Sequence, residues 1–447
     1  MTGKKKMMLL MLFLVGTAVV LLLLATPMML KAIPPRYLSR LPQPIQDLRT
    51  PKQEVAILPT VAVPADLTIL FTPTPTATKM LPPTNTSVPA PQEYTPTPPP
   101  TSTSIPPTFT PIPPSATPVS IPNQARLEGI SHMFQEWNNC GPATLAMTLT
   151  YFDIPARQSE TAAFLKPNPE DRNVSPHEMV SYVKEKTPLD AIFRVNGSQQ
   201  TIRRLLAAGF PVILELGIEP PGELRWMGWY GHYALAVAYD MAEQQFWFYD
   251  SWLGSNEEPL GSVDPDGRMI NSAQIAEFWP QFNRSYVVLF EPIHAQEVAT
   301  IIGENMNDAV MWQNALEEAR EETAANPENP FYWFNLGTAY NTLGQYEEAA
   351  AAYDQARTIG LPWRMLWYQF GPYQAYYEMG RYEDVVLLAN TTLAERPYFE
   401  ESLYYRGLAQ AALGETAAAR QDLQQAASFN PNFTPAAAAL ASLDSGG

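Results

Sequence analysis

The chain has 447 residues, which is long enough for two or three domains with separate hydrophobic cores. Its 45 acidic residues against 28 lysines and arginines give a formal net charge of −17, which argues against general binding to nucleic acid or anionic lipid. A single cysteine excludes an intrachain disulfide framework and a multi-cysteine metal site. We expect neither a metal nor a cofactor.

The N-terminus predicts a membrane anchor. Residues 1–6 are short and basic, and residues 7–30 contain no charged side chain. A helix over the second range would span a bilayer core of about 30 Å. A cleaved signal peptide is the alternative, but the apolar run exceeds the roughly 7–15 residues of a signal h-region, and Leu30-Lys31-Ala32 is a poor cleavage site. Basic residues lie on both sides of the span, so charge does not decide its orientation.

Residues 31–124 form a linker rich in proline, threonine and serine. Residues 51–122 alone hold 20 of the 45 prolines. Such a composition cannot build a core, so we expect a disordered stalk, extended like polyproline II, that reaches up to roughly 200 Å at about 3.1 Å per residue. The stalk favours a single-pass protein of the cell membrane with its C-terminal domains extracytoplasmic. A cytosolic proline-rich ligand for partner domains is the alternative.

The composition becomes globular over residues 125–292. The run that starts at Asn139-Cys140-Gly141-Pro142 predicts a capped helix with proline in its first turn. Two more helices are expected, followed by four strands. The expected helices cover 176–186 and 199–208, and the expected strands cover 211–216, 232–239, 246–250 and 285–290. Helices followed by an antiparallel sheet predict an α+β domain.

Cys140 is the candidate nucleophile. The positive end of a helix dipole favours a thiolate at this position. We expect Gly141 to leave the approach to the sulfur uncrowded. Gln135, five residues upstream, is placed to offer a side-chain amide N–H to a tetrahedral oxyanion.

His232 and Asp250 are the candidate partners of the thiol. His232 opens an apolar strand, and Asp250 ends the next one. In an antiparallel hairpin the end of one strand lies beside the start of its neighbour, so these side chains should meet. Asp240, at the opposite end of the hairpin, is expected in a turn. His132 is the competing base because it is close to Cys140 in sequence.

The two remaining histidines, His177 and His294, are expected at the surface. The aromatic residues before His232, which include Trp226, Trp229 and Tyr230, leave two interpretations open. They either line a substrate site or close the local core.

These motifs resemble the C39-like peptidase family of the papain-like superfamily. The residues that carry the resemblance are Gln135-x-Trp-Asn-Asn-Cys140-Gly-Pro-Ala-Thr-Leu-Ala-Met147, then Gly-His232-Tyr and Tyr-Asp250-Ser-Trp. The resemblance implies Cys140 as nucleophile, His232 as general base and acid, Asp250 as its orienter and Gln135 as oxyanion donor. The spacing from Gln135 to Cys140 is one residue shorter than in many papain-like enzymes. Exporter-fused family members trim bacteriocin leaders after paired glycines, but nothing here resembles an ATPase or a multi-span transporter.

Beyond a helical connector over residues 293–325, residues 326–443 repeat. The residues that match the tetratricopeptide (TPR) pattern in the first repeat are Trp333, Leu336, Gly337, Tyr340, Ala349, Tyr353 and Ala356. Turn glycines at Gly344, Gly380 and Gly414 are 36 and then 34 residues apart, so we expect a longer first helix in the second repeat. We predict an all-α solenoid of three repeats, closed by a helix over 434–443, whose groove binds a peptide or protein.

Together these features predict a membrane-anchored, extracytoplasmic thiol hydrolase that cleaves a peptide or isopeptide bond in a peptide or protein substrate. Two alternatives remain at the level of sequence. One is a catalytically inactive papain-like fold that acts with the TPR repeats as a surface binding module. The other is an acyltransferase that forms the same thioester and passes it to another acceptor.

Overall fold

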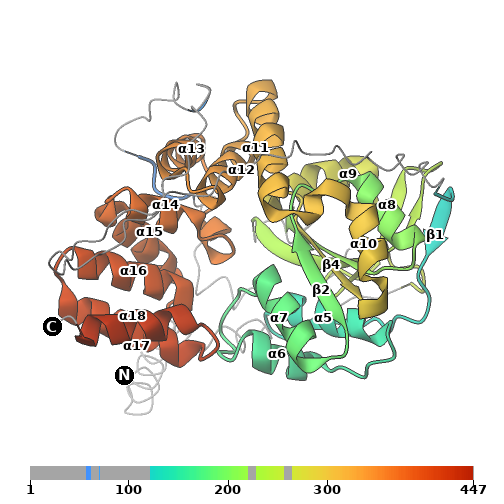
Figure 1. The fold of residues 1–447 in the computed structure, drawn as a ribbon, viewed down its shortest axis with the longest axis horizontal. Helices are drawn as coiled ribbons and strands as arrows, with labels where there is room; N and C mark the ends of the chain where they lie inside the picture. Colours follow the sequence, from blue (N-terminus) through green and yellow to red (C-terminus); the bar gives the residue numbers. More distant parts are fainter. Residues whose placement is uncertain (1–56, 62–69, 71–120, 220–227, 256–263, 446–447) are drawn as a thin grey trace, which may run out of the picture.

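The computed structural model describes residues 57–61, 70, 121–219, 228–255 and 264–445. Within these ranges no helix is both long and apolar enough to cross a membrane, and the predicted anchor lies outside them. Figure 1 shows an α/β unit beside an array of helices, with α11 at their junction.

The α/β unit surrounds one sheet. Its helices are α5 (Cys140–Thr150), α6 (Gln158–Leu165), α7 (Pro176–Lys186), α8 (Gln199–Ala207) and α9 (Ser272–Phe278), with a 3-10 turn η2 (Trp279–Phe282). Its strands are β1 (Gln124–Arg126), β2 (Asp190–Arg194), β3 (Val212–Ile218), β4 (Tyr230–Asp240), β5 (Gln245–Asp250), β6 (Arg268–Asn271) and β7 (Tyr286–Phe290). The predicted helices and strands are present, while α6, α9, β1, β2 and β6 were not predicted.

The seven described strands form an antiparallel sheet. Six follow the order β2-β7-β3-β4-β5-β6, and β1 pairs with the C-terminal end of β4. Alternate residues of β3 face opposite sides, as the period of a strand requires. Val212 and Leu214 pack into a core with α8 and α9, whereas Ile213 packs into a second core with α5 and α7. Because both faces of the sheet are covered, its central strands are almost wholly apolar.

The second part of the chain is helical. A connector of η3 (Pro292–His294), α10 (Ala295–Ile302) and η4 (Gly303–Met306) leads into α11 (Asp308–Ala325). The array continues with α12 (Pro330–Thr342), α13 (Tyr346–Ile359), η5 (Trp363–Trp367), α14 (Gly371–Glu378), α15 (Tyr382–Glu395), α16 (Glu400–Ala412), α17 (Thr416–Phe429) and α18 (Thr434–Ser445). The closing helix is α18.

The prediction of a longer first helix in the second repeat is wrong. α14 has 8 residues, whereas its counterparts α12 and α16 have 13 each. Proline has no backbone N–H and restricts the preceding residue, so Pro372 holds the start of α14 at Gly371. The preceding residues form the separate 3-10 turn η5, which starts after Pro362.

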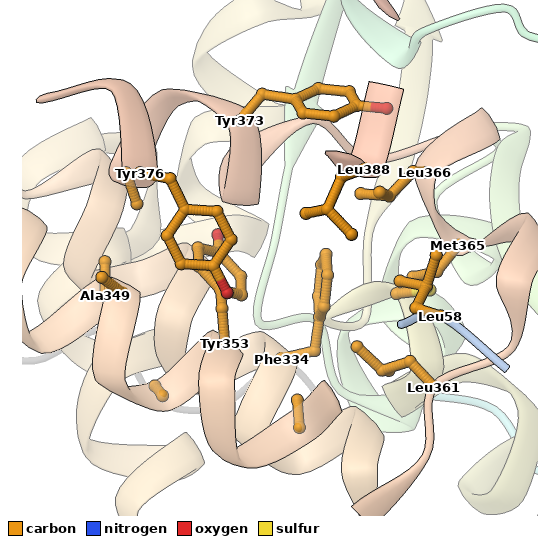
Figure 2. Packing of buried hydrophobic residues seen from close by; sticks show 14 of the residues in the cluster. Leu58, Phe334, Ala349, Tyr353, Leu361, Met365, Leu366, Tyr373, Tyr376 and Leu388 are labelled. Atoms are coloured by element: carbon orange, nitrogen blue, oxygen red, sulfur yellow. The ribbon is translucent and has the colours of Figure 1, made fainter. Parts of the chain in front are cut away.

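The prediction of a linker disordered over its whole length is also wrong, because residues 57–61 and 70 pack against the helical array. Leu58 is buried, and its N–H donates to the carbonyl of Leu361 at 2.9 Å. The carbonyl of Leu70 accepts the hydroxyl of Tyr340 at 2.7 Å. Figure 2 shows Leu58 beside Leu361 in the core of the array.

The α/β unit and the helical array are joined by aromatic stacking. The ring of Trp229 stacks on Phe282 of η2 and on Phe331 of α12, with centroids 5.6 and 5.8 Å apart. Its indole N–H donates to Gln281 at 2.6 Å. Trp229 therefore closes the local core, and Trp226 lies outside the described residues.

Carboxyl groups gather at a second junction, between α7 and α16. Asn430 donates to Glu400 at 2.7 Å and lies 3.5 Å from Glu178 of α7. Glu178 also accepts the N–H of Ser175 at 2.7 Å, as the third residue of a capping box. Burial, opposed by that hydrogen bond and aided by the charge of Glu400, raises the pKa of Glu178 to about 8.

We predict that Glu178→Gln stabilises the chain at alkaline pH but not in acid. Between about pH 4.5 and 8 the folded chain holds a proton on Glu178 that the unfolded chain has released, so stability falls as pH rises through this window. Glutamine keeps an acceptor for Ser175 without the charge. Urea unfolding of the full chain at the two ends of the window measures the difference, up to about 1.4 kcal/mol per pKa unit.

Glu160→Gln is the matched control, because Glu160 holds the same capping-box position in α6 but is exposed. It should leave the pH dependence of stability unchanged. An equal pH dependence in wild type and Glu178→Gln would contradict the assignment.

Candidate active site

Helix α5 presents Cys140 at its first position. Asn139 occupies the cap position without a side-chain cap, and its amide donates instead to Gln158 at 3.4 Å. The first turn carries no acidic residue, so the positive end of the helix remains available to a thiolate. The thiol is half-buried, and the backbone N–H groups of Tyr233 and Gly141 help to lower its pKa.

Gly141 has a packing role that was not predicted. A Cβ at this position would meet Met179 at 3.0 Å and Val174 at 3.1 Å. The glycine therefore allows the start of α5 to pack closely on α7, and this packing fixes the position of the sulfur.

The structure brings His232 and Asp250 together, as the hairpin argument expected. Antiparallel pairing sets Ala234 opposite Asp250, two residues from His232. The ring Nε2 of His232 lies 2.8 Å from Oδ1 of Asp250, and both side chains are buried. Asp240 lies at the other end of the hairpin, where it accepts the N–H groups of Ala242 and Glu243.

Asp250 is held by more than the histidine. Its Oδ1 also accepts the backbone N–H groups of Trp252 and Leu253, at 2.8 and 3.0 Å. Its Oδ2 accepts from Arg268 of β6 at 3.1 Å. These donors fix the carboxylate and leave Oδ1 facing the imidazole.

The electrostatics of the three groups favour a charged pair. Burial disfavours the imidazolium, but the charge and hydrogen bond of Asp250, followed by Cys140, raise the pKa of His232 to about 10. Burial also opposes ionisation of Asp250, yet His232 and Arg268 lower its pKa below the usual range. For Cys140 the raising effect of burial is outweighed by the hydrogen bond and charge of His232, so the pKa of the thiol is lowered.

Gln135 and His132 both lie beside the end of β5. The side-chain oxygen of Gln135 accepts a hydrogen bond from the hydroxyl of Ser251 at 3.0 Å. The backbone N–H of Gln135 donates to the Ser251 carbonyl at 2.7 Å. The hydroxyl of Ser251 therefore holds the carboxamide by its oxygen. The NH₂ group of the carboxamide is the end that can donate to an oxyanion. His132 contacts the backbone carbonyl of Asp250 at 2.8 Å, whereas His232 contacts the Asp250 carboxylate. His177 is exposed and His294 is half-buried.

Two buried ionisable groups near the thiol were missed by sequence reasoning. The ammonium of Lys166 donates to the carbonyl of Asn138, and burial lowers its pKa to about 8. Burial raises the pKa of Glu215 on β3 to about 8, so this carboxyl is neutral near pH 7 and does not oppose the thiolate. Neither residue stands in a motif.

Arg268 was also missed, although its strand held a signal. In Arg-Met-Ile-Asn of β6 the alternate residues Arg268 and Ile270 are buried, while Met269 is exposed. An arginine that shares an apolar face demands a buried anion, and Asp250 is that anion.

The chain carries a C39-like peptidase domain followed by a TPR repeat. Residues 119–286 match the Peptidase_C39 like family, and residues 312–360 match the tetratricopeptide repeat. The second match starts within α11, before the predicted start of the repeats.

Two solved structures are similar to parts of the chain. A putative C39-like peptidase from Bacillus anthracis is 14% identical, with a TM-score of 0.30, over 38% of this chain and 98% of that one. The MamA RS-1 ArsTM double mutant is 17% identical, with a TM-score of 0.27, over 30% of this chain and 74% of that one. No curated protein matches the chain in sequence.

We predict that Asp250→Asn slows alkylation of Cys140 by iodoacetamide near pH 7 by at least about tenfold. Without the carboxylate the imidazolium loses its main support, and the pKa of the thiol rises toward the value that burial dictates. Labelling of the full chain reports this thiol alone, because the sequence has no other cysteine.

Asp240→Asn is the matched control at the opposite end of the same hairpin, and it should label at the wild-type rate. Circular dichroism checks that both variants are folded. Wild-type labelling of folded Asp250→Asn would show that the carboxylate does not activate the thiol.

Proposed function

We propose that the protein is a thiol hydrolase, a cysteine peptidase that cleaves a peptide or isopeptide bond with Cys140 as nucleophile. The supporting observation is the hydrogen bond between His232 and Asp250, together with the opposite pKa shifts that Cys140 and His232 cause in each other. Because Nε2 of the ring faces Asp250, Nδ1 is the nitrogen that remains for the sulfur in this proposal. A thiolate paired with an imidazolium is the activated state of such a nucleophile.

In this mechanism the Cys140 thiolate attacks the substrate carbonyl carbon, and the resulting oxyanion is stabilised by N–H donors at the start of α5 and by the amide of Gln135. His232 then donates its proton to the leaving amine as the C–N bond breaks, which leaves a thioester on Cys140. A water molecule attacks the thioester while His232 accepts its proton, and the acid product leaves with the thiolate restored. Asp250 keeps the ring oriented throughout.

We further propose that residues 7–30 anchor the protein in the cell membrane, with the peptidase and TPR regions extracytoplasmic. The apolar N-terminal run and the Pro/Thr-rich linker support this location. The docking of residues 57–61 on the helical array shortens the tether. Only residues 31–56 separate the anchor from the docked segment, which limits the reach to about 80 Å at about 3.1 Å per residue. In this proposal the TPR region recruits the protein substrate to the membrane-proximal peptidase.

Peptide-library hydrolysis by the full chain tests the proposal. Cys140→Ala and His232→Gln should each reduce kcat/KM by at least about a thousandfold, because the nucleophile and its base act as a unit. His294→Gln is the matched control, since this histidine lies outside the peptidase fold between Glu291 and Glu297.

Hydrolysis that persists in Cys140→Ala would contradict the assigned nucleophile. Binding of peptides without turnover by the wild type would instead favour the binding module. Adding an amine to the reaction distinguishes a hydrolase from an acyltransferase. An acyltransferase would form the amide product in preference to the acid.

A further inference from the structure

The TPR region reaches the residues around the candidate active site. Its 3-10 turn η5 contains Arg364, which donates to the Trp229 carbonyl at 3.0 Å. The same guanidinium lies 4.0 Å from the ring of Tyr230, two residues before His232. A Cβ on Gly231 would meet the ring of Tyr368 at 3.1 Å. The break between η5 and α14 therefore places TPR side chains against the strand that carries the candidate base.

A second arginine joins the two regions on the side of the nucleophile. Arg172, which precedes α7, lies over the ring of Trp137 at 4.7 Å and over the ring of Trp367 at 5.6 Å. Trp137 is three residues before Cys140, and Trp367 is the last residue of η5. Arg172 thus lies between the loop that leads into the nucleophile and the TPR turn.

This junction is rich in hydrogen-bond donors without acceptors. Among the described residues Arg172 has no ion pair and no hydrogen bond, and its Nε is buried. In the part of the chain that the structure describes, the indole N–H groups of Trp137 and Trp367 are also buried without an acceptor. The charges of Glu170 and Lys166 act on Arg172, but neither residue forms an ion pair with it. Unsatisfied buried donors are costly, and an unpaired guanidinium favours an anion with planar oxygens.

We propose that Arg172 binds a carboxylate of the substrate peptide beside the scissile bond, in a subsite whose opposite side is the TPR turn η5. The carboxylate is either an acidic side chain or the free α-carboxylate of the peptide. The inference rests on the proposed function in treating the bound peptide as substrate. Since the whole chain carries a net charge of −17, an acidic peptide would be repelled elsewhere, and local cations give the site its selectivity.

Peptide binding to the full-length Cys140→Ala chain tests the subsite without requiring turnover. The probes are fluorescein-labelled peptide pools that carry Glu or Gln at each position in turn, each prepared with a C-terminal acid and a C-terminal amide. We expect one acidic arm to bind about 10- to 100-fold more tightly than its neutral counterpart. The arm that shows the preference identifies the source of the carboxylate.

Arg172→Gln, added to Cys140→Ala, should abolish this preference, and Arg172→Lys should keep part of it. Arg126→Gln is the matched control, because Arg126 also lies over an indole, that of Trp247, and should leave the preference intact. Equal binding of acidic and neutral pools, or a preference that survives Arg172→Gln, would overturn the proposal. If Arg172→Gln fails to fold, two measurements still test the proposal. They are the affinities of Arg172→Lys for the acidic and neutral pools, and the ratio of these two affinities in the parent Cys140→Ala chain.

The two proposals fail separately. An acidic preference in a chain that hydrolyses no peptide would leave the subsite standing and reject the hydrolase. Hydrolysis without any preference for a carboxylate would support the hydrolase and reject the subsite.

Discussion

The contact between His232 and Asp250 places two ionisable side chains inside a sheet whose central strands are mostly apolar. Burying a carboxylate and an imidazole is costly unless they share a proton and their remaining lone pairs are satisfied. Here Arg268 and two backbone N–H groups meet that requirement for the carboxylate. The low pKa of the Cys140 thiol and the raised pKa of the imidazole both depend on this contact.

The helical array is part of the same physical arrangement. A regular TPR helix in the second repeat would continue through the positions that η5 occupies. Because Pro372 breaks that helix, the aromatic and arginine side chains of η5 turn toward the peptidase domain. The second repeat is therefore joined closely to the other unit: Arg364 contacts Tyr230, two residues before His232, and Trp367 contacts Arg172, which in turn lies over Trp137 in the loop before Cys140.

Much of this arrangement follows from the sequence because its signals are local. The start of α5 at Cys140, the hairpin that joins His232 to Asp250, and the glycine spacing of the repeats each depend on a short segment. Interactions between distant segments carried weaker signals or none. Arg268 meets Asp250 only through the pairing of β5 with β6, and Leu58 packs into the TPR core across some 300 residues of chain.

The second-repeat helix shows the opposite case, in which a local signal was misread. The two extra residues were assigned to a longer helix because the glycine spacing was followed, whereas the proline that interrupts the helix carried the stronger constraint. The packing role of Gly141 was not predicted, since its partners on α7 and in the preceding loop are not visible from its neighbours in sequence.

The proposed activity depends most on the ionisation state of Cys140. The pH dependence of the thiolate's ultraviolet absorbance, taken as the difference between wild type and Cys140→Ala, measures that state directly in a chain with one cysteine. We predict a midpoint below the value of about 8.5 for a free thiol, and a rise of the midpoint above that value in His232→Gln, where burial acts without the imidazolium. A wild-type midpoint at or above about 8.5, unchanged by His232→Gln, would contradict it.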